Sequence, residues 1–253
     1  MMDAMTAPNT ATIAVGVVGA RGRMGSLVCE AVRAAADMDL VAEVDTGDAL
    51  SGLSAADVVV DFTVPDAVMD TVAWCVENSR PLVVGTSGFD EARLEQVRGM
   101  LRPDSAVMVV PNFAVGAVLM MHWAAQAARL FPDAEVLEYH HAAKVDAPSG
   151  TAIRTAHLMA QARREAGLQP KRESMAAQAA ALGDTVDGIP VHASRGSGFI
   201  AHQDVIFGAP GERLTIRHDS LDRASFMPGV LLAIRGVRAH PGLTVGLEPL
   251  LGL

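Results

Sequence analysis

The densest group of residues able to do chemistry lies between positions 138 and 151, in the string Glu-Tyr-His-His-Ala-Ala-Lys-Val-Asp-Ala-Pro-Ser-Gly-Thr. His140 and His141 are adjacent, so on a strand they point to opposite faces and do not suit side-by-side chelation of one metal ion. Imidazole gains and loses a proton near neutral pH, which suits general acid–base work. These histidines are therefore candidates for proton transfer, with a core or capping role as the alternative.

A lysine and a predicted helix start follow within the same string. Lys144 and Lys171 are the only lysines in a chain with 20 Lys and Arg residues. A compact ammonium group suits a position where a point charge or a transferable proton is wanted. Gly150 and Thr151 open a predicted helix, whose free N–H groups and threonine hydroxyl form a seat for an anion. The string thus indicates a site for a carboxylate substrate that must receive a proton, from either the lysine or an imidazole.

A second group of residues has the spacing of a dinucleotide-binding loop. Residues 19–25 read Gly-Ala-Arg-Gly-Arg-Met-Gly, between a predicted strand and a predicted helix. Such glycines let backbone N–H groups approach a pyrophosphate, and Arg21 and Arg23 add positive charge. Asp45 lies 20 residues beyond Gly25, where a carboxylate accepts hydrogen bonds from an adenosine ribose. A plain strand–turn–helix junction followed by a turn aspartate is the alternative.

Three more predicted strands end in small or polar residues. These endings are Asp-Phe-Thr at 61–63, Gly-Thr-Ser-Gly at 85–88 and Pro-Asn-Phe at 111–113. In an open parallel sheet, ligands bind beyond the carboxyl ends of the strands. We therefore expect these segments to approach a nicotinamide ribose and carboxamide, although each could be only a turn.

The elements that must position these residues follow from the hydrophobic pattern of the first half of the chain. Apolar runs at 12–18, 40–44, 57–62, 82–85 and 106–110 alternate with helical patterns at 24–36, 65–78 and 90–101. Strands that alternate with helices in this way predict an α/β fold with a Rossmann-like, doubly wound parallel sheet.

The pattern changes after residue 131. A helix is expected at 151–165, residues 167–188 show no clear period, and strand-like runs follow at 190–194, 199–207 and 213–218. Their close spacing predicts antiparallel pairing. A last helix at 226–237 and a strand at 243–247 complete the pattern.

This pattern predicts two domains. Residues 12–113 together with 226–253 are expected to form the dinucleotide-binding domain, and residues 1–11 a disordered tail. Residues 114–225 are expected to form an α+β domain, with a mixed or antiparallel sheet, for substrate binding and oligomerisation.

Composition excludes several classes of partner. The net charge is −9, and the aromatic residues are seven Phe, two Trp and one Tyr, so no nucleic-acid partner is expected. Residues 113–131 are nearly all apolar, but Arg129 would be costly in lipid, so they predict a buried amphipathic helix and no membrane contact. Cys29 and Cys75 are too few for a disulfide framework or a cysteine zinc site. A cytoplasmic protein without a metal is therefore expected.

Taken together, the motifs resemble one known family. Segments 19–25, 61–63, 85–88, 111–113 and above all 140–151 are similar to those of the 4-hydroxy-tetrahydrodipicolinate reductases, long called dihydrodipicolinate reductases. The resemblance runs from about residue 13 to residue 253, and segments 216–223 and 245–249 resemble actinobacterial members. Two departures are Ser87, where threonine is usual, and a short link between Asp45 and Asp61.

The resemblance implies a reaction and roles for individual residues. It implies hydride transfer from NADH or NADPH to C4 of a cyclic imine dicarboxylate, with proton delivery and loss of water. The reaction belongs to lysine and diaminopimelate biosynthesis, and the enzyme is expected to be a homotetramer. His140 would be the proton donor or acceptor, and Lys144 a proton donor that faces the dicarboxylate. His141, Gly150 and Thr151 would bind substrate. The residues implied to contact the cofactor are Gly19, Ala20, Arg21, Gly22, Arg23, Met24, Asp45, Gly85, Thr86, Ser87, Val110, Pro111, Asn112 and Phe113.

Several points stay open at the level of sequence. NADH is expected to serve at least as well as NADPH, because Thr46 and Gly47, not an arginine, follow Asp45; Arg21 could still hold a 2′-phosphate. The role of Arg195 is open. One alternative is another Rossmann dehydrogenase acting on an amino or hydroxy acid, which leaves the string at 144–151 unexplained. The other is a dinucleotide-binding redox sensor, which the negative charge and the lack of a helix-turn-helix pattern disfavour.

Overall fold

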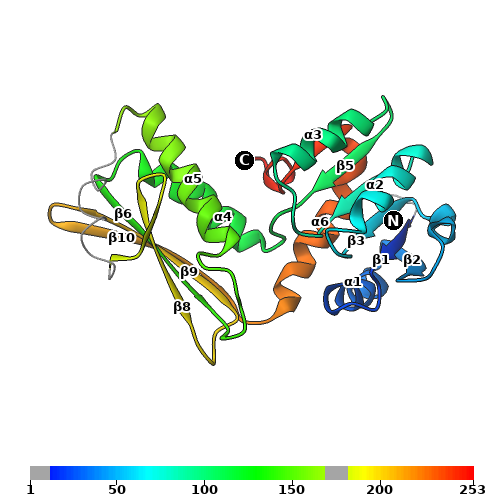
Figure 1. The fold of residues 1–253 in the computed structure, drawn as a ribbon, viewed down its shortest axis with the longest axis horizontal. Helices are drawn as coiled ribbons and strands as arrows, with labels where there is room; N and C mark the ends of the chain where they lie inside the picture. Colours follow the sequence, from blue (N-terminus) through cyan, green and yellow to red (C-terminus); the bar gives the residue numbers. More distant parts are fainter. Residues whose placement is uncertain (1–11, 169–181) are drawn as a thin grey trace, which may run out of the picture. The chain divides into compact units, whose positions relative to one another are not determined.

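The computed structural model describes residues 12–168 and 182–253, which form two compact units (Figure 1). Of the described residues, the first unit comprises 12–113 and 227–252, and the second comprises those within 114–226 and Leu253. The chain therefore leaves the first unit after Phe113 and re-enters it at Met227. Each unit contains a sheet of its own.

The first unit is built on a six-stranded parallel sheet in the order β11-β5-β4-β3-β1-β2. The strands are β1 Ile13–Val18, β2 Met38–Val44, β3 Val58–Asp61, β4 Leu82–Val84, β5 Ala106–Val109 and β11 Gly242–Val245. Every residue of β3, β4 and β5 is buried. Valine-rich runs suit these positions because a parallel sheet is covered on both faces. The sheet confirms the Rossmann-like fold predicted from the alternation of strands and helices.

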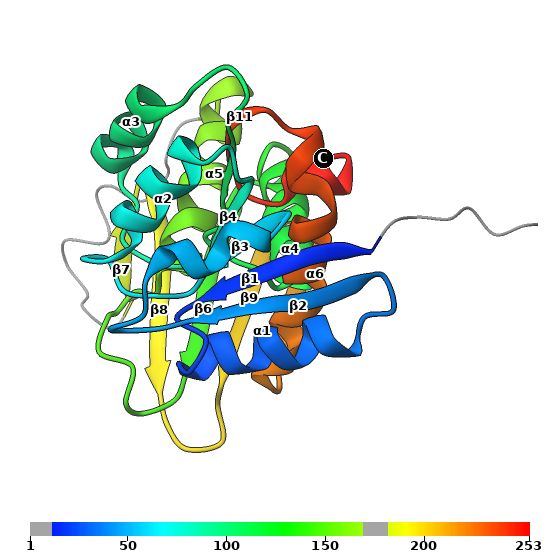
Figure 2. The same ribbon diagram turned by 90° about the vertical axis from the view of Figure 1, so that its right-hand side faces the viewer.

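Helices cover both faces of this sheet (Figure 2). Helix α1 (Arg23–Ala34) packs with α6 (Met227–Gly236), and α2 (Val68–Glu77) packs with α3 (Glu91–Met100) on the other face. Arg235 of α6 donates hydrogen bonds of 2.7 and 2.8 Å to the carboxylate of Asp37, between α1 and β2. This ion pair fastens the returning C-terminal segment to the first unit. Short 3₁₀ helices span Leu50–Ala55, Arg223–Phe226, Val237–Ala239 and Glu248–Leu251.

The second unit is a five-stranded mixed sheet with two helices on one face. The strand order is β10-β9-β6-β8-β7, and helices α4 and α5 pack against each other and against these strands. The element bounds are α4 Val115–Ala128, β6 Asp133–His140, α5 Gly150–Glu165, β7 Asp184–Val186, β8 Ile189–Arg195, β9 Ala201–Ala209 and β10 Glu212–Ser220. Among the helices of the described ranges, none is long and apolar enough to cross a membrane.

The second sheet corrects two expectations from the sequence. Strands β8 and β9 do not pair with each other, because β6 lies between them, antiparallel to β9 and parallel to β8. Strand β6 is absent from the strands predicted above. Strand β7 falls inside residues 167–188, for which the sequence predicted no regular structure. Residues 169–181 of that stretch lie outside the described ranges. Strands β8 and β9 each pair with β6, which is distant in the sequence. Short spacing between strands predicts hairpins only, so it does not reveal these pairings.

A third correction concerns the two adjacent histidines. Strand β6 ends at His140, and His141 begins the following turn, in which the Lys144 N–H donates to the His141 carbonyl oxygen at 3.0 Å. The two rings therefore do not alternate across one strand as expected.

Candidate active site

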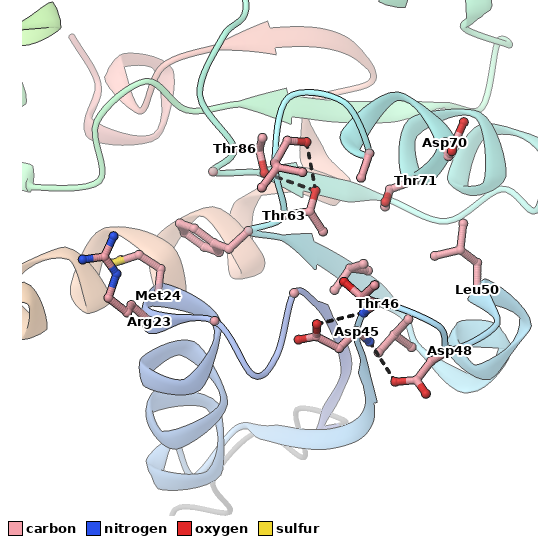
Figure 3. A pocket seen from close by; sticks show the side chains of 18 of the residues that line it. Arg23, Met24, Asp45, Thr46, Asp48, Leu50, Thr63, Asp70, Thr71 and Thr86 are labelled. Atoms are coloured by element: carbon pink, nitrogen blue, oxygen red, sulfur yellow. Dashed lines mark hydrogen bonds between the residues drawn. The ribbon is translucent and has the colours of Figure 1, made fainter. Parts of the chain in front are cut away.

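A cavity of about 800 Å³ lies in the first unit, beyond the carboxyl ends of β1, β2, β3 and β4 (Figure 3). Strand β1 is flanked by β2 on one side and β3 on the other, so the cavity opens where the strand order reverses. Open α/β sheets bind ligands at this point. Thr63 and Thr86 lie on one side of the cavity, and Asp45 and Asp48 on the other (Figure 3).

The glycine loop packs tightly between β1 and α1. Gly19 has a φ of +76°, and its N–H donates to the Val44 carbonyl oxygen of β2 at 2.9 Å. A Cβ atom on Gly25 would lie 2.0 Å from the Gly19 carbonyl oxygen. Helix α1 begins after Gly22 without a side-chain cap, so its first N–H groups are available to an anion. The loop therefore has the close backbone packing that a pyrophosphate cradle requires.

Two carboxylates follow the end of β2. The side chain of Asp45 accepts hydrogen bonds from the N–H groups of Arg21, at 2.7 Å, and Thr46, at 2.8 Å, and these bonds hold the pKa of Asp45 below its usual range. Asp48 accepts from the Asp45 N–H at 3.0 Å and from Arg21 Nη2 at 2.8 Å. The side chains of Asp45 and Asp48 thus tie the glycine loop to the end of β2.

Asp61 organises the ends of β3 and β4 from inside the unit. Its side chain is fully buried, and Oδ1 accepts hydrogen bonds from the hydroxyls of Thr63, at 2.8 Å, and Thr86, at 2.7 Å. A Cβ atom on Gly85 would lie 2.2 Å from the Phe62 ring. The two strand ends are therefore held at fixed positions beside the cavity.

The cavity contains only part of the predicted cofactor-binding set. The predicted residues that line it are Gly19, Gly22, Arg23, Met24, Asp45, Gly85, Thr86 and Ser87. Ala20, Arg21, Val110, Pro111, Asn112 and Phe113 are not among the lining residues. Lining residues outside the predicted set include Thr46, Asp48, Leu50, Val64, Asp70 and Thr71. Most of these lie in the turn after β2 or near the start of α2, and they carry no motif.

The predicted proton-transfer residues lie in the second unit. His140 ends β6, and its Nδ1 contacts the carboxylate of Glu138, which is buried on the same strand. Arg195 at the end of β8 donates two hydrogen bonds of 2.9 Å to that carboxylate. The sequence analysis placed Glu138 in the chemical string without giving it a role, and it left the role of Arg195 open. Their pairing could have been predicted from an acidic residue near the end of one strand and a basic residue at the end of the strand beside it, had the pairing of β6 with β8 been known.

Lys144 and the predicted anion seat lie in the loop between β6 and α5. The Lys144 ammonium group is 2.8 Å from both carboxylate oxygens of Asp146. Ser149 caps α5 by accepting a hydrogen bond from the Ala152 N–H at 3.2 Å. Gly150 and Thr151 form the first turn of α5. The imidazole, the ammonium group and the helix N-terminus therefore belong to one short segment, which runs from the end of β6 to the start of α5.

Comparisons with known proteins identify the same family in both units. The family described as "Dihydrodipicolinate reductase, N-terminus" matches residues 13–113, and "Dihydrodipicolinate reductase, C-terminus" matches residues 116–251. A relative from Nocardia farcinica, named 4-hydroxy-tetrahydrodipicolinate reductase, is 55% identical over 96% of this chain and 100% of its own length. One of the same name from Cutibacterium acnes is 55% identical over 95% of this chain and 99% of its own.

A solved structure gives the same result. The dipicolinate-bound dihydrodipicolinate reductase from Paenisporosarcina sp. TG-14 is 36% identical, with a TM-score of 0.82, over 94% of this chain and 99% of its own. The likeness extends over both units. The chain belongs to the dihydrodipicolinate reductase family.

Proposed function

We propose that the protein is a 4-hydroxy-tetrahydrodipicolinate reductase, an oxidoreductase of lysine and diaminopimelate biosynthesis. It transfers a hydride from NADH or NADPH to C4 of a cyclic imine dicarboxylate. The proposal rests on two observations. One unit contains a cavity at its glycine loop, and the other unit carries His140 and Lys144 in the segment that leads from β6 into α5. The 55% identity to reductases of that name over almost the whole chain supports the same reaction.

The residues of the cavity fit a dinucleotide, which supplies the hydride when bound. The uncapped N-terminus of α1 binds the pyrophosphate, and the close contact between Gly19 and Gly25 keeps side chains out of that space. Each carboxylate oxygen of Asp45 accepts one N–H group, so each retains a lone pair for a ribose hydroxyl. Ser87 at the end of β4 borders the nicotinamide side of the cavity.

In the second unit, the residues bind the dicarboxylate and hold the proton. Hydride addition to the conjugated imine leaves an electron-rich enamine, which needs a nearby acid. His140 and Lys144 are the proposed sources of this proton. His141, Gly150 and Thr151 bind the substrate, with a carboxylate at the N-terminus of α5. The positive charge of Lys144 faces the dicarboxylate and strengthens its binding.

The proposal extends to assembly and location. A homotetramer is proposed, because the second sheet leaves β7 and β10 as edge strands on which chains could associate. A cytoplasmic location is proposed because Cys29 and Cys75 are both free and buried, which suits a reducing compartment.

A coupled assay tests the reaction. Aspartate semialdehyde, pyruvate and the synthase that condenses them are mixed with this protein and NADH, and the decrease in NADH absorbance is followed. Oxidation of NADH that requires all components supports the proposal. If aspartate semialdehyde, homoserine or a hydroxy acid alone turns over the cofactor, the protein is another dehydrogenase instead. His157→Ala serves as a control, since His157 is exposed and paired with Asp187, and activity should be retained.

A further inference from the structure

Glu138 is a buried carboxylate that the proposed reaction does not itself use. It precedes His140 by two residues on β6, so the two side chains lie on the same face of the sheet. The Glu138 side chain has no exposed surface, and that of His140 is 13% exposed. An isolated carboxylate is costly to bury, so its hydrogen-bond partners decide its charge.

Three residues surround this carboxylate. Arg195 donates from Nη1 to Oε2 and from Nη2 to Oε1, both at 2.9 Å, and the Ser149 N–H donates to Oε1 at 3.1 Å. The third partner is the His140 ring. Burial by itself would raise the pKa of Glu138, but the hydrogen bonds with His140 and Arg195 outweigh it and hold the pKa below its usual range. Glu138 is therefore ionised at neutral pH.

This charge state determines which ring nitrogen of His140 holds a proton. An ionised carboxylate can only accept hydrogen bonds, so Nδ1 of His140 donates to Glu138. In the neutral ring, Nε2 then carries the free lone pair. We propose that Glu138 is a positioning residue that locks His140 in the Nδ1–H tautomer, so that Nε2 is the nitrogen that exchanges the catalytic proton.

Arg195 connects this arrangement to the substrate-binding loop. Besides Glu138, it binds the Asp146 carbonyl oxygen through Nη2 at 2.6 Å. The same Asp146 pairs with Lys144 through its side chain, and Ser149 both donates to Glu138 and caps α5. One buried carboxylate thus fixes the proton carrier and the segment that seats the anion, and Arg195 holds both in place.

The proposal rests on the proposed function and concerns the movement of one proton. The Nε2–H bond of the imidazolium breaks, its electron pair stays on Nε2, and the proton forms a C–H bond on the enamine carbon. Nδ1 keeps its proton throughout and continues to donate it to Glu138. The hydride has already reduced the substrate, so this step changes no oxidation state.

The first test uses the unaltered protein without substrate. Nitrogen-15 NMR of histidine-labelled protein distinguishes protonated from unprotonated ring nitrogens, and His140→Gln identifies the His140 signals by their loss. Above the pH at which the ring becomes neutral, we expect a protonated Nδ1 and an unprotonated Nε2. A neutral His140 with its proton on Nε2 overturns the proposal, whether or not Glu138→Gln folds.

The second test is Glu138→Gln, which keeps the shape of the side chain. Two fixed donors, Arg195 Nη2 and the Ser149 N–H, point at the Oε1 position, against Arg195 Nη1 alone at Oε2. The amide oxygen is therefore expected at Oε1, with the amide NH2 facing Nδ1 of His140. We expect the ring to switch to the Nε2–H tautomer. We also expect kcat to fall by about 10²–10⁴-fold with KM changed by less than about threefold, as for other misoriented catalytic histidines.

Glu135→Gln is the matched control. Glu135 also lies on β6, and its carboxylate pairs with His192 at 3.0 Å, so the same substitution there should leave kcat and the His140 signals unchanged. An unchanged tautomer in Glu138→Gln, or an equal loss of kcat in Glu135→Gln, contradicts the proposal. If the NMR results are as expected but the coupled assay shows no reduction, the proposed function fails, while the locking of the His140 tautomer by Glu138 stands.

Discussion

At the scale of single residues, Asp48 makes the cofactor preference testable. Its ion pair with Arg21 at 2.8 Å joins side chains that are 40% and 70% exposed, so the pair contributes no more than about 1 kcal/mol. Arg21 is the glycine-loop cation that could hold a 2′-phosphate beside Asp45. Asp48 already binds this guanidinium group, and its own charge repels the phosphate. The wild-type protein should therefore use NADH at least as well as NADPH.

Asp48→Asn should shift this preference toward NADPH. An asparagine oxygen at the Oδ2 position can still accept from the Asp45 N–H and from Arg21 Nη2, but the negative charge that holds Arg21 and repels the phosphate is lost. We expect kcat/KM for NADPH to rise by roughly tenfold, because a new hydrogen bond between Arg21 and the phosphate is worth about 1.4 kcal/mol. The value for NADH should stay nearly constant. Asp70→Asn, which alters another carboxylate lining the cavity, is the control. An unchanged ratio in Asp48→Asn would show that Arg21 does not reach the phosphate.

Substitutions of His140 and Lys144 should have different effects on KM and kcat. Lys144→Ala removes the ammonium group that we propose faces the dicarboxylate, so we expect a higher KM for the dicarboxylate as well as a lower kcat, for a loss of roughly 1.5–3 kcal/mol. His140→Ala should lower kcat by about 10²–10⁴-fold and leave KM little changed. NADH titrations followed by fluorescence should show normal binding in both, because the glycine loop belongs to the other unit. Loss of NADH binding in Lys144→Ala would show that the loop between β6 and α5 supports the fold, and would contradict the proposed role of Lys144 in substrate binding.

At the scale of elements, two glycines provide a test of the dinucleotide cradle. Gly25→Ala would place a Cβ atom 2.0 Å from the Gly19 carbonyl oxygen, whereas a Cβ atom on Gly99 in α3 meets nothing within 4 Å. We expect Gly25→Ala to lower the free energy of unfolding by about 1–3 kcal/mol and to weaken NADH binding. Gly99→Ala should stabilise by about 0.5–1 kcal/mol. Isothermal titration and urea unfolding measure both, and normal NADH binding in Gly25→Ala would argue against the cradle.

The stabilisation that Glu138 on β6 gives through its ion pair with Arg195 on β8 should depend on pH. The folded-state pKa of Glu138 lies below its ordinary value, so its ionised form stabilises the fold above about pH 4.3, and this contribution is lost as the pH falls through the folded-state value. We therefore expect the difference in unfolding free energy between wild type and Glu138→Gln to be largest near neutral pH and to shrink in acid. Urea unfolding between about pH 3 and pH 7 measures it. A difference that is independent of pH would mean that the carboxylate charge is not the cause.

The elements also show which parts of the structure the sequence can predict. The first sheet and its glycine loop were predictable because strand, turn and helix follow one another locally, as at β1, residues 19–25 and α1. Strand β6 was missed, since its partners β8 and β9 are chosen by long-range pairing rather than by hairpins. The same reason hid the contact of Glu138 with Arg195, which lies 57 positions away. A buried ion pair of this kind leaves no local pattern.

At the scale of the whole molecule, the chain combines two units that each have their own sheet. The dinucleotide cavity is made entirely by the first unit, while the proposed proton-transfer residues and the anion seat belong to the second. Each ligand should therefore stabilise its own unit directly, by an amount that grows with ligand concentration relative to Kd.

The rate at which the two cysteines are labelled measures how often the first unit opens. Cys29 in α1 and Cys75 in α2 are both buried in the first unit, and burial raises the pKa of Cys29 to about 11 and that of Cys75 further still. Thiol labelling near neutral pH should therefore be slow and should require opening of this unit. NADH at about 100 times its Kd should slow labelling by about 100-fold, whereas pyridine-2,6-dicarboxylate alone should have little effect, because its proposed site is in the second unit. Equal protection by both ligands would show that the two units open together.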